Sequence, residues 1–421
     1  MKAGFILPSN GNAGGVFVVY IQAQALVQKG WDVTIVFASY NSEIGFGAFP
    51  GTALKHCTLD AAIEAKMHFD ILFGTWWETV FHLPKLVAGS YLYFVQSDER
   101  RFYPETESRS RTLVEFTYRL NSLGIITEAR WIQSFLQRDF GSTVEYAPNG
   151  VDTRLFNSEG PPLVPKQEKL RVLIEGAGMH PFKRIDDAFA AVKPLRDKAN
   201  LETWYVSSDG FSKPEWQFDR IFKKVPYKDM PGIYRSCDIL VKLSAVEGFF
   251  GPPLEMMACG GTVVVSNVTG HEEYIEDGKN ALVVPVGDIA SATTAIAKLV
   301  TDQNLRARLQ HNGHHTAQNM DWGNQTGYFE KAAVRLARQK KGLSSYERNL
   351  IESLFYFRTQ LDYLTERNQE LNKVLNFPEH LAASRFRSHL KRFPCAQMLR
   401  RFILGWHSST TAATHNQGQR L

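Results

Sequence analysis

Two glutamates on either side of a glycine- and proline-rich loop form the most distinctive pattern in the sequence. Glu247 and Glu255 flank the stretch Gly248–Leu254, so seven residues separate the two carboxylates. Carboxylates at two points of one extended ligand can accept its hydroxyl groups, and the backbone N–H groups of the loop can meet a phosphate between them. Either glutamate taken alone is more simply a solvated charge or an acid near a helix N-terminus, which contributes only ~0.3–1 kcal/mol. As a pair they indicate a site for a ligand with hydroxyl and phosphate groups.

A second loop suited to a phosphate lies near the start of the chain, at Gly11-Asn12-Ala13-Gly14-Gly15. Glycines there let the backbone approach a ligand, and the N-terminus of the helix predicted at 16–28 favours an anion. A tight turn is the plain alternative. The loop is not Gly-x-Gly-x-x-Gly, and the next predicted strand ends in Ala38-Ser39-Tyr40, without the acid that holds an NAD ribose. The pattern therefore argues against nicotinamide chemistry.

The elements that carry these loops alternate between short apolar runs and segments of helical period. The runs predict buried parallel strands at 1–8, 32–37, 69–73, 90–95 and 124–127, and again at 170–174, 202–206, 238–243 and 262–266. A proline-rich polar stretch at 161–169 separates the two series and predicts a linker. We therefore expect two doubly wound α/β domains, at 1–160 and 166–338, that face each other across a cleft at the carboxyl ends of their sheets.

The chain continues beyond these domains with a heptad segment, predicted as a helix at 343–376. Its apolar residues step alternately by four and three, and Asn368 falls where a buried asparagine fixes register in parallel dimers: Leu350, Leu354, Phe357, Leu361, Leu364, Asn368, Leu371 and Leu375. The seam predicts either a homodimer through Leu350–Leu375 or a helix packed on its own chain, and the sequence leaves both open.

The last segment, 380–421, is a basic tail. It contains seven lysines and arginines and no acidic residue, so the formal charge of +5 leaves −2 on residues 1–379. Basic and apolar residues alternate in Leu381–Trp406, which predicts contact with an anionic membrane surface, although Pro394 interrupts any single helix and a solvated tail is the alternative. No nucleic-acid partner is expected.

Composition places the protein in a reducing compartment. The four cysteines form no Cys-x-x-Cys pair, which argues against a disulfide framework and a zinc site. No run approaches the ~20 apolar residues that a membrane-spanning helix needs. We expect a cytoplasmic protein, or one peripheral on the inner face of the cell membrane.

The region around Glu247 and Glu255 resembles the Glu-x7-Glu signature of retaining GT-B glycosyltransferases, in particular glycosyltransferase family 4. The similarity extends from residue 1 to about residue 338, and further family segments occur in the same order: Gly14-Gly15, Ala147–Phe156, Thr269–Gly278, Pro285–Asp288 and Asp321-Trp322. Phe94–Pro104 is similar to bacterial polysaccharide rhamnosyltransferases within this family.

The resemblance implies a role for each matching residue. Glu247 would contact hydroxyls of the donor sugar, Glu255 the nucleotide ribose, and Lys183 the diphosphate, whose departure develops negative charge that a fixed ammonium stabilises. Alternatively, Lys183 is an ordinary surface lysine at the start of a helix, but a positive charge there is disfavoured by the helix dipole. Further donor-binding residues are Gly14, Gly15, Asn149, Gly248, Phe249 and Phe250.

The sequence departs from the family at two places. The stretch Glu175–Gly178 lacks the arginine that usually precedes the lysine, and Arg184 stands where a glycine usually follows it, so Arg184 is expected to supply the second catalytic charge. The usual first-domain histidine is also absent. Its place is taken by loops expected to face the acceptor, in which a tryptophan stacks on a sugar or lies in the core: Trp76, Trp77, Gln96 and Asp98.

The resemblance therefore implies an enzyme that moves a sugar from a nucleoside diphosphate to a glycan or lipid-linked acceptor, in bacterial surface polysaccharide synthesis. No Asp-x-Asp metal site stands out, so neither a metal nor a cofactor is expected. The alternatives are a GT-B nucleotide-sugar epimerase, which the Glu-x7-Glu loop disfavours, and a non-catalytic nucleotide-sugar-binding scaffold that dimerises through the heptad helix. An NAD oxidoreductase is more distant.

Overall fold

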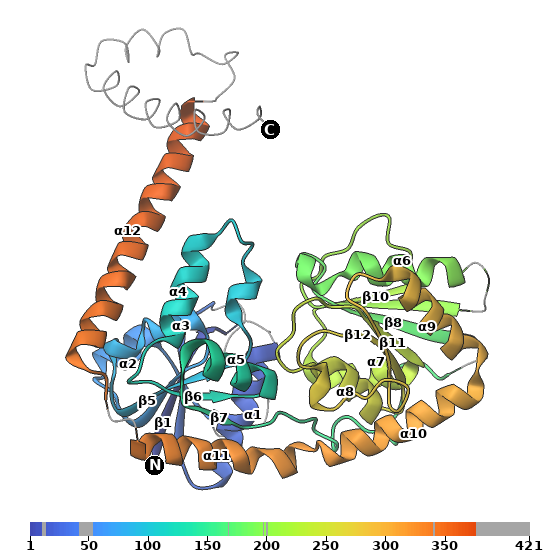
Figure 1. Cartoon of the computed structure of the whole chain (residues 1–421), viewed down its shortest axis with the longest axis horizontal. Helices are drawn as coiled ribbons and strands as arrows, with labels where there is room; N and C mark the ends of the chain where they lie inside the picture. The colour runs from blue at the N-terminus through green and yellow to red at the C-terminus, as the bar shows by residue number, and fades with distance from the viewer. Residues whose placement is uncertain are drawn as a thin grey trace, which may run out of the picture. The chain divides into compact units, whose positions relative to one another are not determined.

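The computed structural model describes residues 1–10, 14–41, 54–166, 168–196, 198, 201–339 and 342–375. Two parallel sheets flanked by helices form most of these residues (Figure 1). The predicted architecture is confirmed: two doubly wound Rossmann-like domains, followed by a helical region. Residues 11–13 of the first glycine loop lie outside the described residues.

The first domain is built on a seven-stranded parallel sheet with the order β3-β2-β1-β4-β5-β6-β7. Its strands are β1 (Lys2–Ser9), β2 (Asp32–Ser39), β3 (Lys55–Thr58), β4 (His68–Gly74), β5 (Val87–Val95), β6 (Gly124–Thr127) and β7 (Val144–Tyr146). The helices are α1 (Gly14–Gln28), α2 (Leu59–Glu64), α3 (Trp77–Val80), α4 (Ser108–Tyr118) and α5 (Arg130–Phe140), with short 3-10 turns η1 (Leu83–Lys85) and η2 (Glu99–Phe102). The central strands are apolar on both faces because helices cover both sides of the sheet.

The second domain repeats this plan with six parallel strands in the order β10-β9-β8-β11-β12-β13. These are β8 (Leu170–Gly176), β9 (Leu201–Ser207), β10 (Arg220–Lys223), β11 (Ile239–Lys242), β12 (Thr262–Ser266) and β13 (Leu282–Val284). Its helical segments are η3 (Pro181–Lys183), α6 (Ile185–Arg196), η4 (Tyr227–Asp229), α7 (Met230–Ser236), α8 (Gly251–Ala258), η5 (His271–Glu273), α9 (Ile289–Thr301) and α10 (Gln303–Asn319). Two separate apolar clusters fill the two faces of the sheet.

The strand order creates a switch point in each sheet. In the second domain β8 pairs with β9 on one side and with β11 on the other. The connections after β8 and β11 therefore leave the sheet in opposite directions, which opens a crevice at the carboxyl ends of these strands. Lys183 follows β8 and Glu247 follows β11, so both lie at this crevice.

Helix α11 (Trp322–Gln339) packs on the first domain, although the sequence assigned residues 166–338 to the second. Its buried side chains belong to the core between α1 and the first sheet: Phe329, Ala332, Ala333 and Leu336. Figure 1 shows α11 running along that sheet after α10. Its helical period predicts a buried face, but it does not reveal which sheet that face covers.

Helix α12 (Ser345–Leu375) coincides with the segment expected at 343–376. Met1–Glu352 form one compact unit and Ser353–Leu421 a second, of which the structure describes residues up to Leu375. Several large apolar side chains of α12 are exposed, including Phe357 (61%) and Leu364 (59%). The tail, with Leu381–Trp406, lies outside the described residues. Within the described part of the chain, no helix combines the length and hydrophobicity needed to cross a membrane.

Candidate functional site

The carboxyl edge of the second sheet brings Lys183 and Glu247 together. The lysine Nζ donates to both carboxylate oxygens of Glu247, each at 2.9 Å. Burial would raise the pKa of Glu247, but the positive charges of Lys183 and Lys242 outweigh it and hold that pKa below its ordinary value. Glu247 is only 8% exposed. It is therefore an ionised carboxylate in an almost closed environment.

Glu255, in α8, has both of its oxygens engaged by tyrosine hydroxyls. Tyr227 donates to Oε1 and Tyr234 to Oε2, each at 3.0 Å. Burial raises the pKa of Glu255 to about 7; the charge of Glu175 adds to the rise, and the two tyrosine hydrogen bonds oppose it. This carboxyl group therefore changes charge near neutral pH. A ligand hydroxyl that binds it has to compete with the two phenols.

A second buried ion pair, absent from the sequence predictions, lies beside the first. Lys242 ends β11, and its Nζ lies 2.6 Å from Glu175 Oε2 and 3.1 Å from the Glu175 carbonyl oxygen. Burial would lower the pKa of Lys242, but the charges of Glu175 and Glu247 raise it above its ordinary value. The available signal was the lysine itself, because a charge inside the apolar run 238–243 needs a buried partner.

The loop between the two glutamates touches the first domain through its backbone. The Phe249 N–H donates to Glu128 Oε1 at 3.1 Å. A Cβ on Gly248 would lie 1.8 Å from the Gln96 carbonyl oxygen, so only glycine allows this approach. The Phe250 side chain is fully buried in the second-domain core. The loop is thus anchored by one side chain while its backbone faces the opposite domain.

Asn149 supports Glu128 rather than any charge of the second domain. Its Nδ2 donates to Glu128 Oε2 at 2.7 Å, and both residues are buried. Burial raises the pKa of Glu128 to about 8, against the hydrogen bonds from Asn149 and Phe249. The sequence analysis did not indicate Glu128, which lies two residues before α5 and resembles an ordinary helix start. Asn149, expected to contact the donor, is linked to the Gly248–Phe250 loop through Glu128, which also accepts from the Phe249 N–H.

Gly14 and Gly15 begin α1 and are exposed. A Cβ on Gly15 would lie 3.1 Å from Gln96 Oε1. Gln96 Nε2 donates to the Thr75 carbonyl at 3.4 Å, whereas its buried Oε1 has no hydrogen-bond partner among the described residues. The structure therefore brings together a glycine expected on the donor side and a glutamine expected on the acceptor side.

The two tryptophans after β4 have different environments. Trp77 is 2% exposed, and its indole N–H donates to the Tyr103 hydroxyl at 3.0 Å, which makes it a core residue. Trp76 is half-buried, with its ring centre 5.6 Å from that of Phe102, which lies 5.3 Å from Phe182 of the second domain. Trp77 is therefore the tryptophan that lies in the core, and Trp76 is the one of the two whose ring is accessible to a ligand.

Two further charged residues of the predicted set pair with local partners. Asp98 Oδ1 lies 2.9 Å from Arg100 Nε. Arg184 adopts a left-handed backbone with φ of 48°, and its Nε lies 2.5 Å from Asp187 Oδ2. The left-handed φ explains why the resembled family has glycine at this position. The guanidinium of Arg184 is thus engaged by Asp187 of α6.

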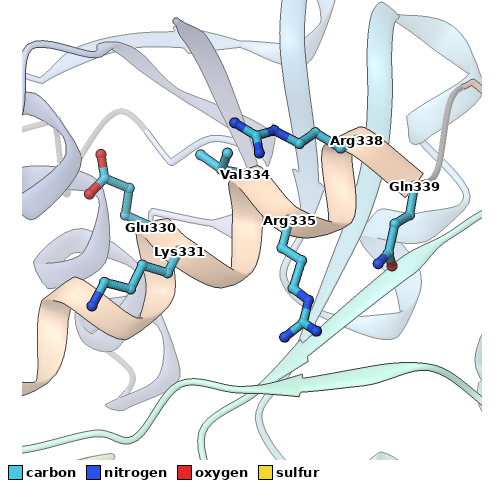
Figure 2. Close-up of a pocket in the computed structure, with 6 residues that line it drawn as sticks. All are labelled: Glu330, Lys331, Val334, Arg335, Arg338 and Gln339. Carbon is cyan, nitrogen blue, oxygen red and sulfur yellow. The ribbon is translucent and has the colours of Figure 1, made fainter.

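A hollow beside α11 has none of the chemistry of this site. Its lining comes from one helix, and Figure 2 shows the charged ends of Arg335 and Arg338 pointing to opposite sides: Glu330, Lys331, Val334, Arg335, Arg338 and Gln339. Side chains that diverge in this way do not surround a ligand. In the described part of the chain, no three histidine, cysteine or acidic side chains are grouped to hold a metal ion.

Comparison with known proteins agrees with this geometry. Residues 220–316, which include Glu247 and Glu255, match the family described as Glycosyl transferases group 1. The uncharacterized glycosyltransferase MJ1178 of Methanocaldococcus jannaschii is 24% identical over 210 residues, which cover 48% of this chain and 56% of that protein. The O-antigen biosynthesis protein RfbC of Myxococcus xanthus is 26% identical over 263 residues, covering 60% of this chain and 20% of that protein.

A solved structure extends the similarity to the whole body of the chain. HepE of Anabaena, crystallised in complex with UDP-glucose, has a TM-score of 0.62 at 15% sequence identity, covering 80% of this chain and 100% of HepE. The chain spans about half the length of MJ1178 and about a fifth of RfbC. The fold of residues in both sheets is therefore of the GT-B type, and the segment that matches the group 1 family contains Glu247 and Glu255.

Proposed function

We propose that the chain is a retaining glycosyltransferase that moves a sugar from a nucleoside diphosphate to a hydroxyl group of a glycan or lipid-linked acceptor. The observation that carries the proposal is the Lys183–Glu247 pair at the switch point of the second sheet, with Glu255 following in α8; both glutamates lie inside the segment that matches the group 1 family. Carboxylates suit sugar and ribose hydroxyls, and an ammonium suits a diphosphate.

In the proposed reaction the bond between the anomeric carbon and the diphosphate oxygen breaks, and the acceptor oxygen bonds to the same face of the sugar. The acceptor proton passes to the leaving diphosphate, so the reaction needs no protein base. Lys183 stabilises the charge that develops on the diphosphate. Glu247 orients the sugar hydroxyls and Glu255 the ribose, while the backbone of Gly248–Phe250 lines the pocket between them.

The acceptor side is assigned to the first domain. Trp76 offers a half-buried aromatic face beside Phe102, and aromatic faces stack on the apolar faces of sugar rings. Gln96 Oε1 offers a buried acceptor that a sugar hydroxyl can satisfy. Asp98 contributes by fixing Arg100 at the start of η2.

The finer identity of the enzyme is also part of the proposal. We assign it to family 4, with rhamnosyltransferases as the nearest type, and expect it to work without a metal ion. RfbC is described as an O-antigen biosynthesis protein, which supports bacterial surface polysaccharide as the product. The basic tail Leu381–Trp406 would hold the enzyme at an anionic membrane surface on the cytoplasmic side.

The exposed apolar side chains of α12 support a parallel homodimer through Leu350–Leu375. Asn368 lies at an a position of this heptad, and Leu361 and Leu364 are exposed at the neighbouring a and d positions. Leu364→Asp should halve the mass measured by light scattering. A chain that is monomeric before the substitution contradicts the dimer and leaves the enzyme proposal untouched.

The direct test measures donor binding and turnover. Thermal unfolding is followed with a panel of nucleoside diphosphates and their sugars, and a ligand at ~100 times its Kd should add about 2.7 kcal/mol of stability. Sugar transfer to extracted lipid-linked glycans is then measured with EDTA present. Glu247→Gln should abolish transfer, whereas Glu276→Gln, a glutamate 62% exposed, should leave it unchanged.

The outcomes separate the alternatives. Transfer that persists in EDTA supports a metal-independent transferase. Conversion of the donor to its epimer identifies an epimerase, and binding without turnover identifies a scaffold. A chain that binds no nucleotide sugar at all contradicts the proposal.

A further inference from the structure

Both lysines of the site are paired with carboxylates of the same domain. Lys183 donates to both oxygens of Glu247, and Lys242 donates to the carboxylate and the carbonyl of Glu175. Both ammonium groups are thus bound to a carboxylate. An incoming diphosphate carries negative charge and meets Glu175, Glu247 and Glu255, so it can bind only if an ammonium group changes partner.

On the basis of the proposed function, we propose that donor binding exchanges the partners of Lys183: the diphosphate takes Lys183 from Glu247, and Lys242 remains on Glu175 and keeps Glu247 charged to accept the sugar hydroxyls. Lys242 is therefore a positioning residue of the donor site. It acts through Glu247 and need not touch the donor.

The surroundings of the two lysines decide which one moves. The Lys183 side chain is 23% exposed and belongs to the three-residue turn η3, whereas the Lys242 side chain is 3% exposed and belongs to a central strand. Lys242 also holds two acceptors of one residue. Lys183 can reach a ligand with a change of rotamer, but Lys242 is fixed in the sheet.

The charges that face Glu247 explain why a second cation is needed. Two are positive, Lys183 from η3 and Lys242 from β11; the carboxyl of Glu128, from the first domain, also faces it. Lys242 also interacts electrostatically with Glu255 of α8 and Glu175 of β8. Once Lys183 has moved to the diphosphate, Lys242 is the positive charge among the described residues that still acts on Glu247. Without the charge of Lys242, burial would favour the protonated form of Glu247. A protonated carboxyl group accepts hydrogen bonds from sugar hydroxyls less well than a carboxylate does.

Two further observations, on Gly176 and on Arg184, support these different roles of Lys183 and Lys242. Gly176, with φ of 150°, lies between the lysines: a Cβ there would be 3.7 Å from Lys183 Cβ and 3.7 Å from Lys242 Nζ. Both lysines therefore approach the same glycine at the end of β8, where Ile185 Cδ1 would also lie 2.9 Å from the added Cβ. Arg184, the other candidate for a second charge, is bound to Asp187. The second positive charge, which the sequence analysis expected from Arg184 after β8, is instead supplied by Lys242 at the end of β11.

The test uses the full chain and the pH dependence of transfer. The acid limb of kcat reports protonation of Glu247 in the enzyme–donor complex, in which Lys183 has moved to the diphosphate. In Glu175→Gln/Lys242→Met, which removes both members of the buried pair and leaves no unpaired charge, the limb should move up by about one pH unit. In Glu175→Gln alone it should move down, because Lys242 loses its carboxylate and acts more strongly on Glu247.

Matched variants separate this effect from loss of folding. Glu276→Gln/Lys279→Met removes a surface pair of the same composition, 62% exposed on both sides, and should leave the limb in place. Lys242→Arg keeps the charge and should also leave it in place. Donor affinity by titration calorimetry at pH 5.5 and 7.5 gives the same comparison without turnover, and the double variant should lose affinity mainly at pH 5.5.

Opposite shifts in the single and double variants support the exchange, because a purely structural role changes thermal stability without moving the limb in two directions. An acid limb that is the same in wild type, Glu175→Gln and the double variant overturns the inference while the proposed function stands. A wild-type chain that transfers no sugar and binds no nucleotide sugar overturns both.

Discussion

The two domains share a strand order, but the polar groups at their carboxyl edges are satisfied in different ways. In the second domain Lys183 and Lys242 are paired with Glu247 and Glu175, and Glu255 accepts from two tyrosine hydroxyls. In the first domain three buried oxygens after β5 have no hydrogen-bond partner among the described residues: Gln96 Oε1, Ser97 Oγ and Glu99 Oε1. A buried polar group without a hydrogen-bond partner costs ~1–3 kcal/mol of stability, so such atoms are unusual in the core of a folded protein.

This difference indicates two modes of ligand binding. A ligand at the second domain has to replace contacts that already exist, which favours a charged group such as a diphosphate. A ligand at the first domain gains hydrogen bonds that are missing in its absence, which favours neutral hydroxyl donors. In the proposed function, the donor side therefore selects by charge exchange and the acceptor side by unfilled hydrogen bonds.

The largest effect should come from the first-domain core beneath this edge. Trp77→Ala removes a buried ring that packs on Phe81 and Tyr103, and should cost ~3–5 kcal/mol of unfolding free energy. Chemical denaturation measures the loss. A change below about 1 kcal/mol would mean that Trp77 is not part of the packed core.

Gly248→Ala tests the contact between the domains. The added Cβ would meet the Gln96 backbone oxygen, so the loop has to move from the first domain, and we expect a loss of about a hundredfold in kcat/KM. Gly251→Ala is the matched control, since a Cβ there meets nothing within 4 Å. Equal activity of the two variants would show that the domains need not touch at Gly248 during the reaction.

Glu99→Gln tests the unsatisfied edge through pH. Burial raises the pKa of Glu99 from its ordinary 4.5 to about 8, so between these values the folded chain holds a proton that the unfolded chain has lost. Stability from this group is complete at acidic pH and falls as pH rises to about 8, by at most ~1.4 kcal/mol per pH unit. The variant should show a flatter decline of unfolding free energy between pH 5 and 8. An identical decline in wild type and variant would assign the pH dependence to other groups, of which Glu128 is the first candidate.

Trp76→Ala should give the smallest effect and the most specific one. Its ring is half-buried against Phe102, so stability should change little, while the KM for the acceptor should rise about tenfold and the KM for the donor should not. Initial rates at varied acceptor and donor concentrations measure both. A rise in the donor KM alone would show that Trp76 contacts the donor and not the acceptor.

The sequence predicted the centre of each sheet but not its edges. The four strands that it did not indicate are β3 and β7 in the first sheet and β10 and β13 in the second, and all four are outermost. An edge strand pairs on one side and is partly solvated, so it needs no continuous apolar run. The central strands, buried on both faces, carry the runs that made them recognisable.

The site was predictable where its residues lie near each other in sequence or repeat a family segment. Glu247, Glu255 and Lys183 come from such segments, and the structure brings Lys183 and Glu247 into direct contact. Lys242 and Glu128 were missed because their role depends on partners from other strands or the other domain. Sequence spacing contains little information on such contacts.

The course of the chain between the domains limits how the protein can be dissected. Val151, after the first sheet, forms a parallel bridge with Asp321, directly before α11, and α11 then completes the first core with Phe329 and Leu336. A fragment that ends at residue 160 would lack that helix and expose the apolar surface it covers. An isolated first domain should be made as 1–160 joined by a short linker to 320–339, and a second-domain fragment should end at residue 320.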